Sequence, residues 1–181
     1  DEQQYLCHWR TMYRILNEHS EVRERRDQRR HPVYQKPELL ATAPNQVWSW
    51  DITKLRGPHK GTYFALYAVL DIFSRYVVGW MIAERELASL AKTLIEDSCR
   101  KEGIEAEQLT IHSDNGKPMR SKSLALLYAD LGINASFNRP YTSDDNPFSE
   151  SQFKTLKYQP DYPDHFGSIQ DARVWARPFF D

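Results

Sequence analysis

The sequence predicts an α/β domain built on a mixed five-stranded sheet, with helices on its faces and a helical arm in front. Three strand-like stretches follow one another after residue 46 with no helical stretch between them, which is typical of an antiparallel meander. Helical and strand-like stretches then alternate to the end of the chain. We therefore expect three antiparallel strands followed by two parallel additions.

The strands are predicted from short runs rich in β-branched and aromatic residues. A Phe-Ser-Arg segment between the second and third runs allows a tight hairpin turn. The five predicted strands cover residues 47–53, 62–73, 76–83, 109–114 and 133–138.

Helices are predicted where apolar residues recur every three or four positions. Gly103 is expected to end the first helix, and Asn146 to cap the third, with Pro147 in its first turn. Pro178 is expected to disturb the last turn of the fourth. The four predicted helices cover residues 87–103, 121–132, 146–158 and 168–181.

The chain divides into a helical arm at residues 1–31, a proline-containing linker at 32–45 and the α/β domain at 46–181. Within the arm, residues 5–31 have helical character throughout. The second half of the arm is rich in arginine, and two interpretations stay open: a solvated helix face, or contacts to a DNA backbone. The arginines concerned are Arg23, Arg25, Arg26, Arg29 and Arg30.

Overall composition limits the function only weakly. The formal net charge is −1, with 24 Lys and Arg against 25 Asp and Glu, so any basic surface must be local. Cys7 and Cys99 lie far apart and favour free thiols over a disulfide or a zinc site. No apolar run approaches the roughly 20 residues of a membrane span. We expect a soluble intracellular fragment or processed product without a membrane partner.

Three acidic residues stand out by their positions. Asp51 lies within the first predicted strand among aromatic residues, and Asp114 ends the fourth, before an Asn-Gly turn. Glu150 lies in the first turn of a helix, with 35 residues between it and Asp114. If the first and fourth strands are neighbours, Asp51 and Asp114 come side by side, and the helix that carries Glu150 can close over them.

Carboxylates placed so closely repel one another, by about 4 kcal/mol for a pair about 4 Å apart at an effective dielectric near 20. Either they hold protons or cations neutralise them. Oxygen ligands suit Mg²⁺ or Mn²⁺, and two such ions can activate the attacking oxygen and stabilise the leaving oxygen of a phosphodiester. Without metal, Asp51 is expected either to have a raised pKa or to be disordered near its neighbours.

Five segments together resemble the catalytic core of bacterial insertion-sequence (DDE) transposases, which are similar to retroviral integrases and have an RNase H-like fold. The segments are NQVWSWDITKL, LDIFSRYVVGW, HSDNG, DDNPFSE and FKTLKYQPDYP, and the resemblance runs from about residue 44 to the end. More loosely, HWRTMYRIL in the arm is similar to the last helix of the helix-turn-helix that precedes this core, so the arm is expected to be its remnant.

The resemblance implies that Asp51, Asp114 and Glu150 are the catalytic triad and hold two Mg²⁺ (or Mn²⁺) ions. It implies cleavage of a DNA 3′ end, joining of the 3′-OH to target DNA, and a homo-oligomer assembled on element-end and target DNA. It also implies location in the bacterial cytoplasm, at the nucleoid.

Several neighbouring residues have two interpretations each. Lys154 follows Glu150 by one helical turn and could simply pair with it, but the resemblance favours DNA phosphates as the partner of Lys154 and Lys157. Arg139 and Tyr141 flank the same loop and are further candidates for DNA contact. His112 and Asn115 are candidates for supporting the metal ligands from behind, although a hydrogen-bonded structural histidine is an equal alternative.

Three other acids are expected to be structural. Asp71 is predicted to brace a hairpin or pair with Arg75, and Asp144 and Asp145 to cap the following helix or shape its loop. Two alternative functions remain: an RNase H-like nuclease without strand transfer, and a transposase-derived DNA-binding module. The product of the reaction separates the first from a transposase, and the presence of three acids argues against the second.

Overall fold

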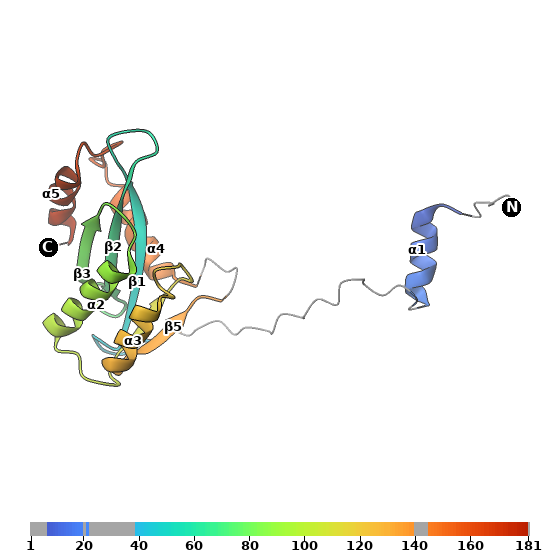
Figure 1. The fold of residues 1–181 in the computed structure, drawn as a ribbon, viewed down its shortest axis with the longest axis horizontal. Coiled ribbons are helices and arrows are strands. Elements are labelled where there is room, and N and C mark those ends of the chain that lie inside the picture. Colours follow the sequence, from blue (N-terminus) through green and yellow to red (C-terminus); the bar gives the residue numbers. More distant parts are fainter. Residues whose placement is uncertain (1–6, 20, 22–38, 140–144, 181) are drawn as a thin grey trace. The chain divides into compact units, whose positions relative to one another are not determined.

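The structure, a computed structural model, describes residues 7–19, 21, 39–139 and 145–180 (Figure 1). The chain divides into two compact units, Asp1–Tyr34 and Gln35–Asp181, which are considered separately here. Asp144 and most of the predicted linker lie outside the described residues. The same is true of six residues predicted to contact DNA: Arg23, Arg25, Arg26, Arg29, Arg30 and Tyr141.

The first unit has one described helix, α1 (Trp9–Glu18), whose large apolar side chains are exposed. The helix ends at Glu18, so the prediction of helix over residues 5–31 is wrong at residues 19 and 21. The backbone N–H of Glu21 turns back to the carbonyl of Leu16. Glu18 and Glu21 bring negative charge to the end of a helix where the dipole favours positive charge, and no basic residue lies in the last turn.

The second unit contains a five-stranded sheet in the order β3-β2-β1-β4-β5. The pairs β1/β2 and β2/β3 are antiparallel, and the pairs β1/β4 and β4/β5 are parallel. The predicted mixed sheet, with its first and fourth strands adjacent, is therefore confirmed. The strands are β1 (Val47–Arg56), β2 (Tyr63–Asp71), β3 (Val77–Ala83), β4 (Thr110–Ser113) and β5 (Asn134–Phe137).

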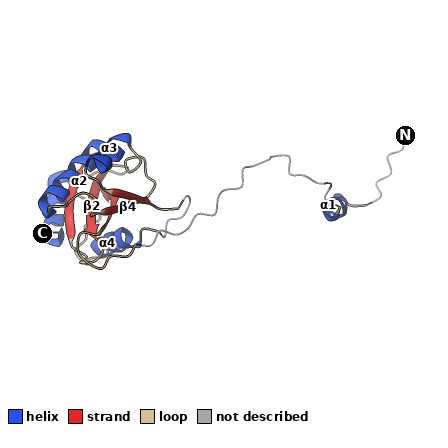
Figure 2. Cartoon of the chain, turned by 90° about the horizontal axis from the view of Figure 1, so that it is seen from below, coloured by secondary structure: helices blue, strands red, loops and turns tan. Residues whose placement is uncertain are grey.

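Helices cover both faces of this sheet, with α3 and α4 on opposite sides in Figure 2. One face packs against α2 and α3, and the other packs against α4 and α5, which gives two separate apolar cores. The helices are α2 (Ala88–Glu102), α3 (Lys122–Asp130), α4 (Pro147–Lys157) and α5 (Ile169–Phe180).

The central strand β1 contributes to both cores because its side chains alternate between the two faces. Trp48 and Trp50 are fully buried in the core with α2 and α3. Leu55 lies in the other core, with Phe153 and Leu156 of α4. This alternation directs the odd-numbered positions of β1, including Asp51, toward the face covered by α4.

Two helix ends test the sequence predictions. Gly103 ends α2 in the left-handed conformation, with φ 63°, as predicted. Pro178, however, lies inside α5, which continues to Phe180, so the predicted disturbance is wrong. Val174, four residues before Pro178, is 71% exposed, so solvent can hydrate its carbonyl, and the buried Phe180 ring stacks on Trp80 with centroids 5.1 Å apart.

Within the described residues, Cys7 and Cys99 are free cysteines, and Cys99 is buried. None of the described helices is both long and apolar enough to cross a lipid bilayer.

Candidate active site

Asp51 lies near the middle of β1, the central strand of the sheet, opposite Ala68 of β2. Its side chain is only half-buried, whereas the preceding residues of the strand are buried. One carboxylate oxygen, Oδ1, accepts a hydrogen bond from the backbone N–H of Ile52 at 2.7 Å. The rigid centre of the sheet therefore fixes the position from which this carboxylate projects.

Asp114 directly follows β4, the strand that lies between β1 and β5. In the parallel β1/β4 ladder Ser49 lies opposite His112, so Asp51 and Asp114 are each two residues beyond a matched pair. Asp114 Oδ1 accepts a hydrogen bond from Gly116 N–H at 2.8 Å, which holds the carboxylate at the turn. The two aspartates thus reach the same level of the sheet, as the sequence predicted.

Glu150 lies in the first turn of α4, which packs against β1 and β2. Asn146 occupies the predicted N-cap position, but its side chain makes no capping hydrogen bond. Its amide instead contacts Ser49 and the Trp50 carbonyl of β1, so Asn146 is the N-cap residue by position, as predicted, but its side chain does not cap the helix. The buried Ser149 hydroxyl also reaches Ser49, at 2.6 Å. These contacts dock the first turn of α4 onto the strand that carries Asp51.

The pKa of Asp51 is raised from 3.8 to about 7, which confirms the predicted direction. Burial is the largest cause, and the hydrogen bond from Ile52 opposes it. Negative charge on three other acids raises the pKa further: Asp114, Glu150 and Glu86. The two other predicted acids therefore act electrostatically on Asp51, together with Glu86, which the sequence did not single out.

Over the described ranges, no group of three His, Cys, Asp or Glu side chains lies close enough to hold a metal ion. The test of fit therefore rests on the chemistry of the donors. Asp51, Asp114 and Glu150 offer carboxylate oxygens, and the negative charges of Asp114 and Glu150 disfavour ionisation of Asp51. Hard oxygen donors with excess negative charge suit Mg²⁺ or Mn²⁺ rather than zinc.

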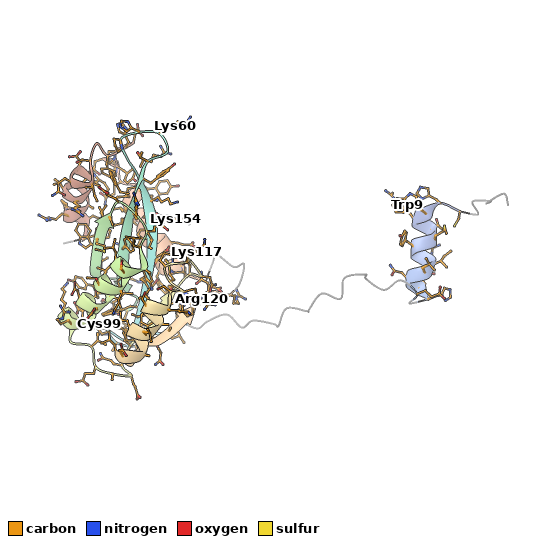
Figure 3. All side chains as sticks on the ribbon, viewed as in Figure 1. Trp9, Lys60, Cys99, Lys117, Arg120 and Lys154 are labelled. Atoms are coloured by element: carbon orange, nitrogen blue, oxygen red, sulfur yellow. The ribbon has the colours of Figure 1, made fainter. Side chains whose placement is uncertain are left out.

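Lys157 lies beside Asp51 on the α4 side of the sheet. Its Nζ donates a hydrogen bond to Thr53 Oγ1 of β1 at 2.6 Å. Burial lowers the pKa of Lys157, while the charge of Asp51 opposes that change. Lys154 is exposed on α4 (Figure 3), and no ion pair joins it to Glu150 among the described residues.

Arg139, a predicted DNA contact, pairs with Asp145 across the base of a loop. Its Nε and Nη2 donate to the two carboxylate oxygens at 2.9 and 3.0 Å, and its backbone N–H adds a third bond. These bonds raise the pKa of Arg139. Asp145 is buried, and the loop that it was predicted to shape lies outside the described residues. The ion pair accounts for the position of Arg139 without DNA, and its DNA contact stays a prediction.

His112, in β4, and Asn115, just after it, make hydrogen bonds to β5 and to Asn138, the residue that follows β5. His112 is fully buried, and its ring nitrogens contact Ser136 Oγ at 3.0 Å and Asn138 Oδ1 at 2.8 Å. Asn115 Nδ2 donates to the Asn138 carbonyl at 2.7 Å. Burial lowers the pKa of His112. His112 is thus a hydrogen-bonded histidine, as one alternative predicted, while support of the metal ligands by His112 and Asn115 stays a prediction.

Asp71 braces the β2–β3 hairpin, as predicted, and makes no ion pair with Arg75 among the described residues. Its carboxylate is 1% exposed and accepts hydrogen bonds from Asn45 N–H and from the N–H and hydroxyl of Ser74. The Arg75 guanidinium lies over the Phe148 ring, 4.3 Å from its centroid.

Sequence reasoning missed several residues around the acids. Thr53, Glu86 and Asn138 gave no signal, because such polar residues are common in strands and loops and become informative only with their partners. A polar residue two positions from Asp51 on the same strand face was the available signal for Ser49.

The integrase core domain family matches residues 41–143, more than half of this chain. The chain belongs to this family of transposase and integrase catalytic cores. The transposase for insertion sequence element IS904 of Lactococcus lactis subsp. lactis is 33% identical over 132 residues, covering 73% of this chain and 51% of the relative. The chain thus spans about half the length of the curated relatives it matches.

Solved structures have the same fold at low sequence identity. An integrase chain of the simian T-cell lymphotropic virus intasome, in complex with PP2A regulatory subunit B56 gamma, has a TM-score of 0.56 at 22% identity. That match covers 80% of this chain and 52% of the other. The HTLV-2 integrase catalytic core domain in complex with magnesium (trimeric form) has a TM-score of 0.52 at 19% identity, covering 76% and 87%. The predicted RNase H-like fold is confirmed.

Proposed function

We propose that this chain is the catalytic core of a DNA transposase that cleaves the 3′ ends of its element and joins them to target DNA. Two observations support the proposal: the parallel β1/β4 register brings Asp51 and Asp114 to the same level of the sheet, and the negative charges of Asp114 and Glu150 help to raise the pKa of Asp51. A DNA-binding protein without catalysis gains nothing from this repulsion. Membership of the integrase core domain family supports the same reaction class.

Asp51, Asp114 and Glu150 would hold two Mg²⁺ ions. When bound, these ions supply a more nucleophilic attacking oxygen and stabilise the leaving oxygen of the phosphodiester. The central strands β1 and β4 orient the two aspartates, and the first turn of α4 brings Glu150 to them. The HTLV-2 integrase core that has this fold is described in complex with magnesium.

The lysines of α4 would bind DNA phosphates beside the acids. Lys157 is held at Thr53, within electrostatic range of Asp51, so it lies where a scissile phosphate must approach the carboxylates. Lys154 is one turn nearer Glu150 and exposed, which suits a phosphate further along the backbone. Both positive charges also reduce repulsion between the acids and the DNA.

The partners of the whole protein follow from this reaction. Element-end DNA and target DNA are its substrates, and a homo-oligomer assembled on two ends is expected in the bacterial cytoplasm at the nucleoid. The arm at residues 1–31, with its arginines, would add DNA backbone contacts as a helix-turn-helix remnant, joined to the catalytic core at 46–181 by the linker at 32–45.

The test is a strand-transfer assay. The chain is incubated with labelled element-end DNA, a target plasmid and Mg²⁺, and the products are separated on a denaturing gel. A transposase core gives target-joined strands with the wild type and none with Asp51→Asn, while both bind the end DNA. Cleaved but unjoined strands identify the nuclease alternative. Joining by Asp51→Asn overturns the assignment of the triad.

A further inference from the structure

Three buried polar side chains form a cluster between β1 and the first turn of α4. Ser49, Asn146 and Ser149 are 0%, 2% and 3% exposed. The Ser49 hydroxyl lies 2.5 Å from Asn146 Oδ1 and 2.6 Å from Ser149 Oγ. We call these residues the Ser-Asn-Ser cluster. Asn146 and Ser149 lie 97 and 100 positions beyond Ser49 along the chain.

The hydrogen bonds of the cluster are directional. Ser49 has one hydroxyl hydrogen, which it donates to Asn146 Oδ1, so Ser149 must donate to Ser49. Asn146 Nδ2 then donates to the Trp50 carbonyl at 3.4 Å. Each side chain therefore has a partner, as buried polar groups require.

Asn146 gives up a common local role to join this cluster. An asparagine at an N-cap usually bonds to the backbone of its own helix, which stabilises the helix by about 1 kcal/mol. Asn146 occupies that position without making the bond, and its side chain contacts β1 instead. The cross-element contact thus replaces helix capping at this site.

Apart from the hydrogen bond of Lys157 to Thr53 at the other end of the helix, the contact between α4 and the sheet is mainly apolar. Phe153 and Leu156 pack with Leu55 and Leu66, and such contacts are not directional. Hydrogen bonds, in contrast, weaken steeply when donor and acceptor shift. The Ser-Asn-Ser cluster therefore fixes the position of the first turn of α4 along β1, which the apolar contacts alone leave free to slide.

We infer that Ser49, Asn146 and Ser149 are positioning residues that set Glu150 against Asp51 for the Mg²⁺ site. Ser49 is two residues from Asp51 on the same strand face, and Ser149 directly precedes Glu150. The cluster thus joins the backbone segments that carry two of the three acids, Asp51 and Glu150. This inference rests on the proposed function, because it concerns the same metal site.

The test measures Mg²⁺ binding to the whole chain by isothermal titration calorimetry, without DNA. Ser49→Ala is expected to raise the Kd for Mg²⁺ about tenfold, since losing a residue that orients a metal ligand typically weakens binding by 10–100-fold. Asn146→Ala is expected to act similarly, and the double variant no more strongly than either alone, because both lose the same contact.

Ser98→Ala is the matched control. Ser98 is also a buried serine, and its hydroxyl donates to the Leu94 carbonyl within α2, on the opposite face of the sheet. It should lose comparable stability but keep the Kd within twofold of wild type. All variants are compared where urea unfolding shows them folded; if Ser49→Ala does not fold, Ser149→Ala, which leaves the Ser49–Asn146 bond, takes its place.

The outcomes separate the two proposals. A Kd for Ser49→Ala or Ser149→Ala within twofold of the Ser98→Ala value overturns the positioning role while wild-type binding still supports the proposed function. Additive effects in the double variant also contradict a shared contact. Wild type that binds no Mg²⁺, or Asp51→Asn that binds it equally well, overturns the proposed function and this inference with it.

Discussion

Two aspartates in the same sheet have opposite surroundings. Asp71, at the end of β2, is almost fully buried, and its carboxylate accepts three hydrogen bonds from Asn45 and Ser74. Asp51, at the centre of β1, accepts one bond from the next residue and faces the charges of other acids. Hydrogen bonds stabilise the Asp71 carboxylate, whereas the single hydrogen bond to Asp51 does not offset the cost of burying its charge.

This contrast distinguishes a structural acid from a functional one. Both lie in strands among apolar residues, and the more buried of the two is Asp71, so burial alone does not mark the acid proposed to be catalytic. The hydrogen-bond partners do, because a buried charge must be compensated by partners, protonation or a cation. Asp51 is left with the last two, and a cation is the one that catalysis can use.

The largest expected effect separates the two residues by activity. Asp51→Asn should lower strand transfer by about a thousandfold or more, since a metal ligand contributes several kcal/mol to the transition state. Asp71→Asn should leave the rate per folded molecule within a few-fold of wild type. Initial rates in the joining assay, corrected for the folded fraction, check both; equal losses would erase the distinction.

The next effect separates them by stability. Asp71→Ala should lower the free energy of unfolding by about 2–4 kcal/mol, because it leaves buried donors of Asn45 and Ser74 without their acceptor. Urea unfolding at pH 7 without metal measures it. A change below about 0.5 kcal/mol would show that the hairpin does not depend on this carboxylate.

Asp51→Asn should have the opposite sign in the metal-free protein. The pKa of Asp51 in the fold is about 7, above its ordinary 3.8, so the folded state holds a proton that the unfolded state loses between these pH values. Wild-type stability therefore falls as pH rises from about 4 to 7. Allowing for the half-exposed side chain, Asp51→Asn should be more stable by about 1–3 kcal/mol at pH 8 and equal near pH 4. Urea titrations at both pH values test this, and a destabilised Asp51→Asn at pH 8 would contradict it.

The smallest expected effect concerns DNA rather than the acids. Lys154→Ala should weaken binding of end DNA only modestly and lower the slope of log affinity against log salt by about 0.7–0.9, the loss of one phosphate contact. Fluorescence anisotropy over a salt series measures the slope. Lys92→Ala, on α2 over the other face of the sheet, is the control and should leave the slope unchanged.

The sequence predicted the sheet well because its evidence is local. Strand-like runs and helix periodicity gave the order of elements, and adjacency of β1 and β4 then brought Asp51 and Asp114 together. Asp71 was also interpreted correctly as a brace of the hairpin, because one of its partners, Ser74, lies only three residues away in the predicted turn.

The parts that could not be predicted depend on contacts between distant segments. Asn146 had the sequence signature of an ordinary cap, and only the docking of α4 on β1 turns its amide toward Ser49, 97 positions away. Arg139 was predicted to contact DNA, and its ion pair with Asp145 was not anticipated from the sequence. Local propensity does not show whether a polar side chain bonds to the backbone next to it or to a distant segment.

The central claim is that a divalent cation is the missing partner of Asp51. The most direct measurement follows the urea midpoint of wild type and of Asp51→Asn at pH 7.5 as Mg²⁺ is added. The account predicts that Mg²⁺ stabilises wild type progressively and leaves Asp51→Asn nearly unchanged, because only the former gains a ligand for the ion. Equal stabilisation of both proteins, or none of wild type, would contradict it.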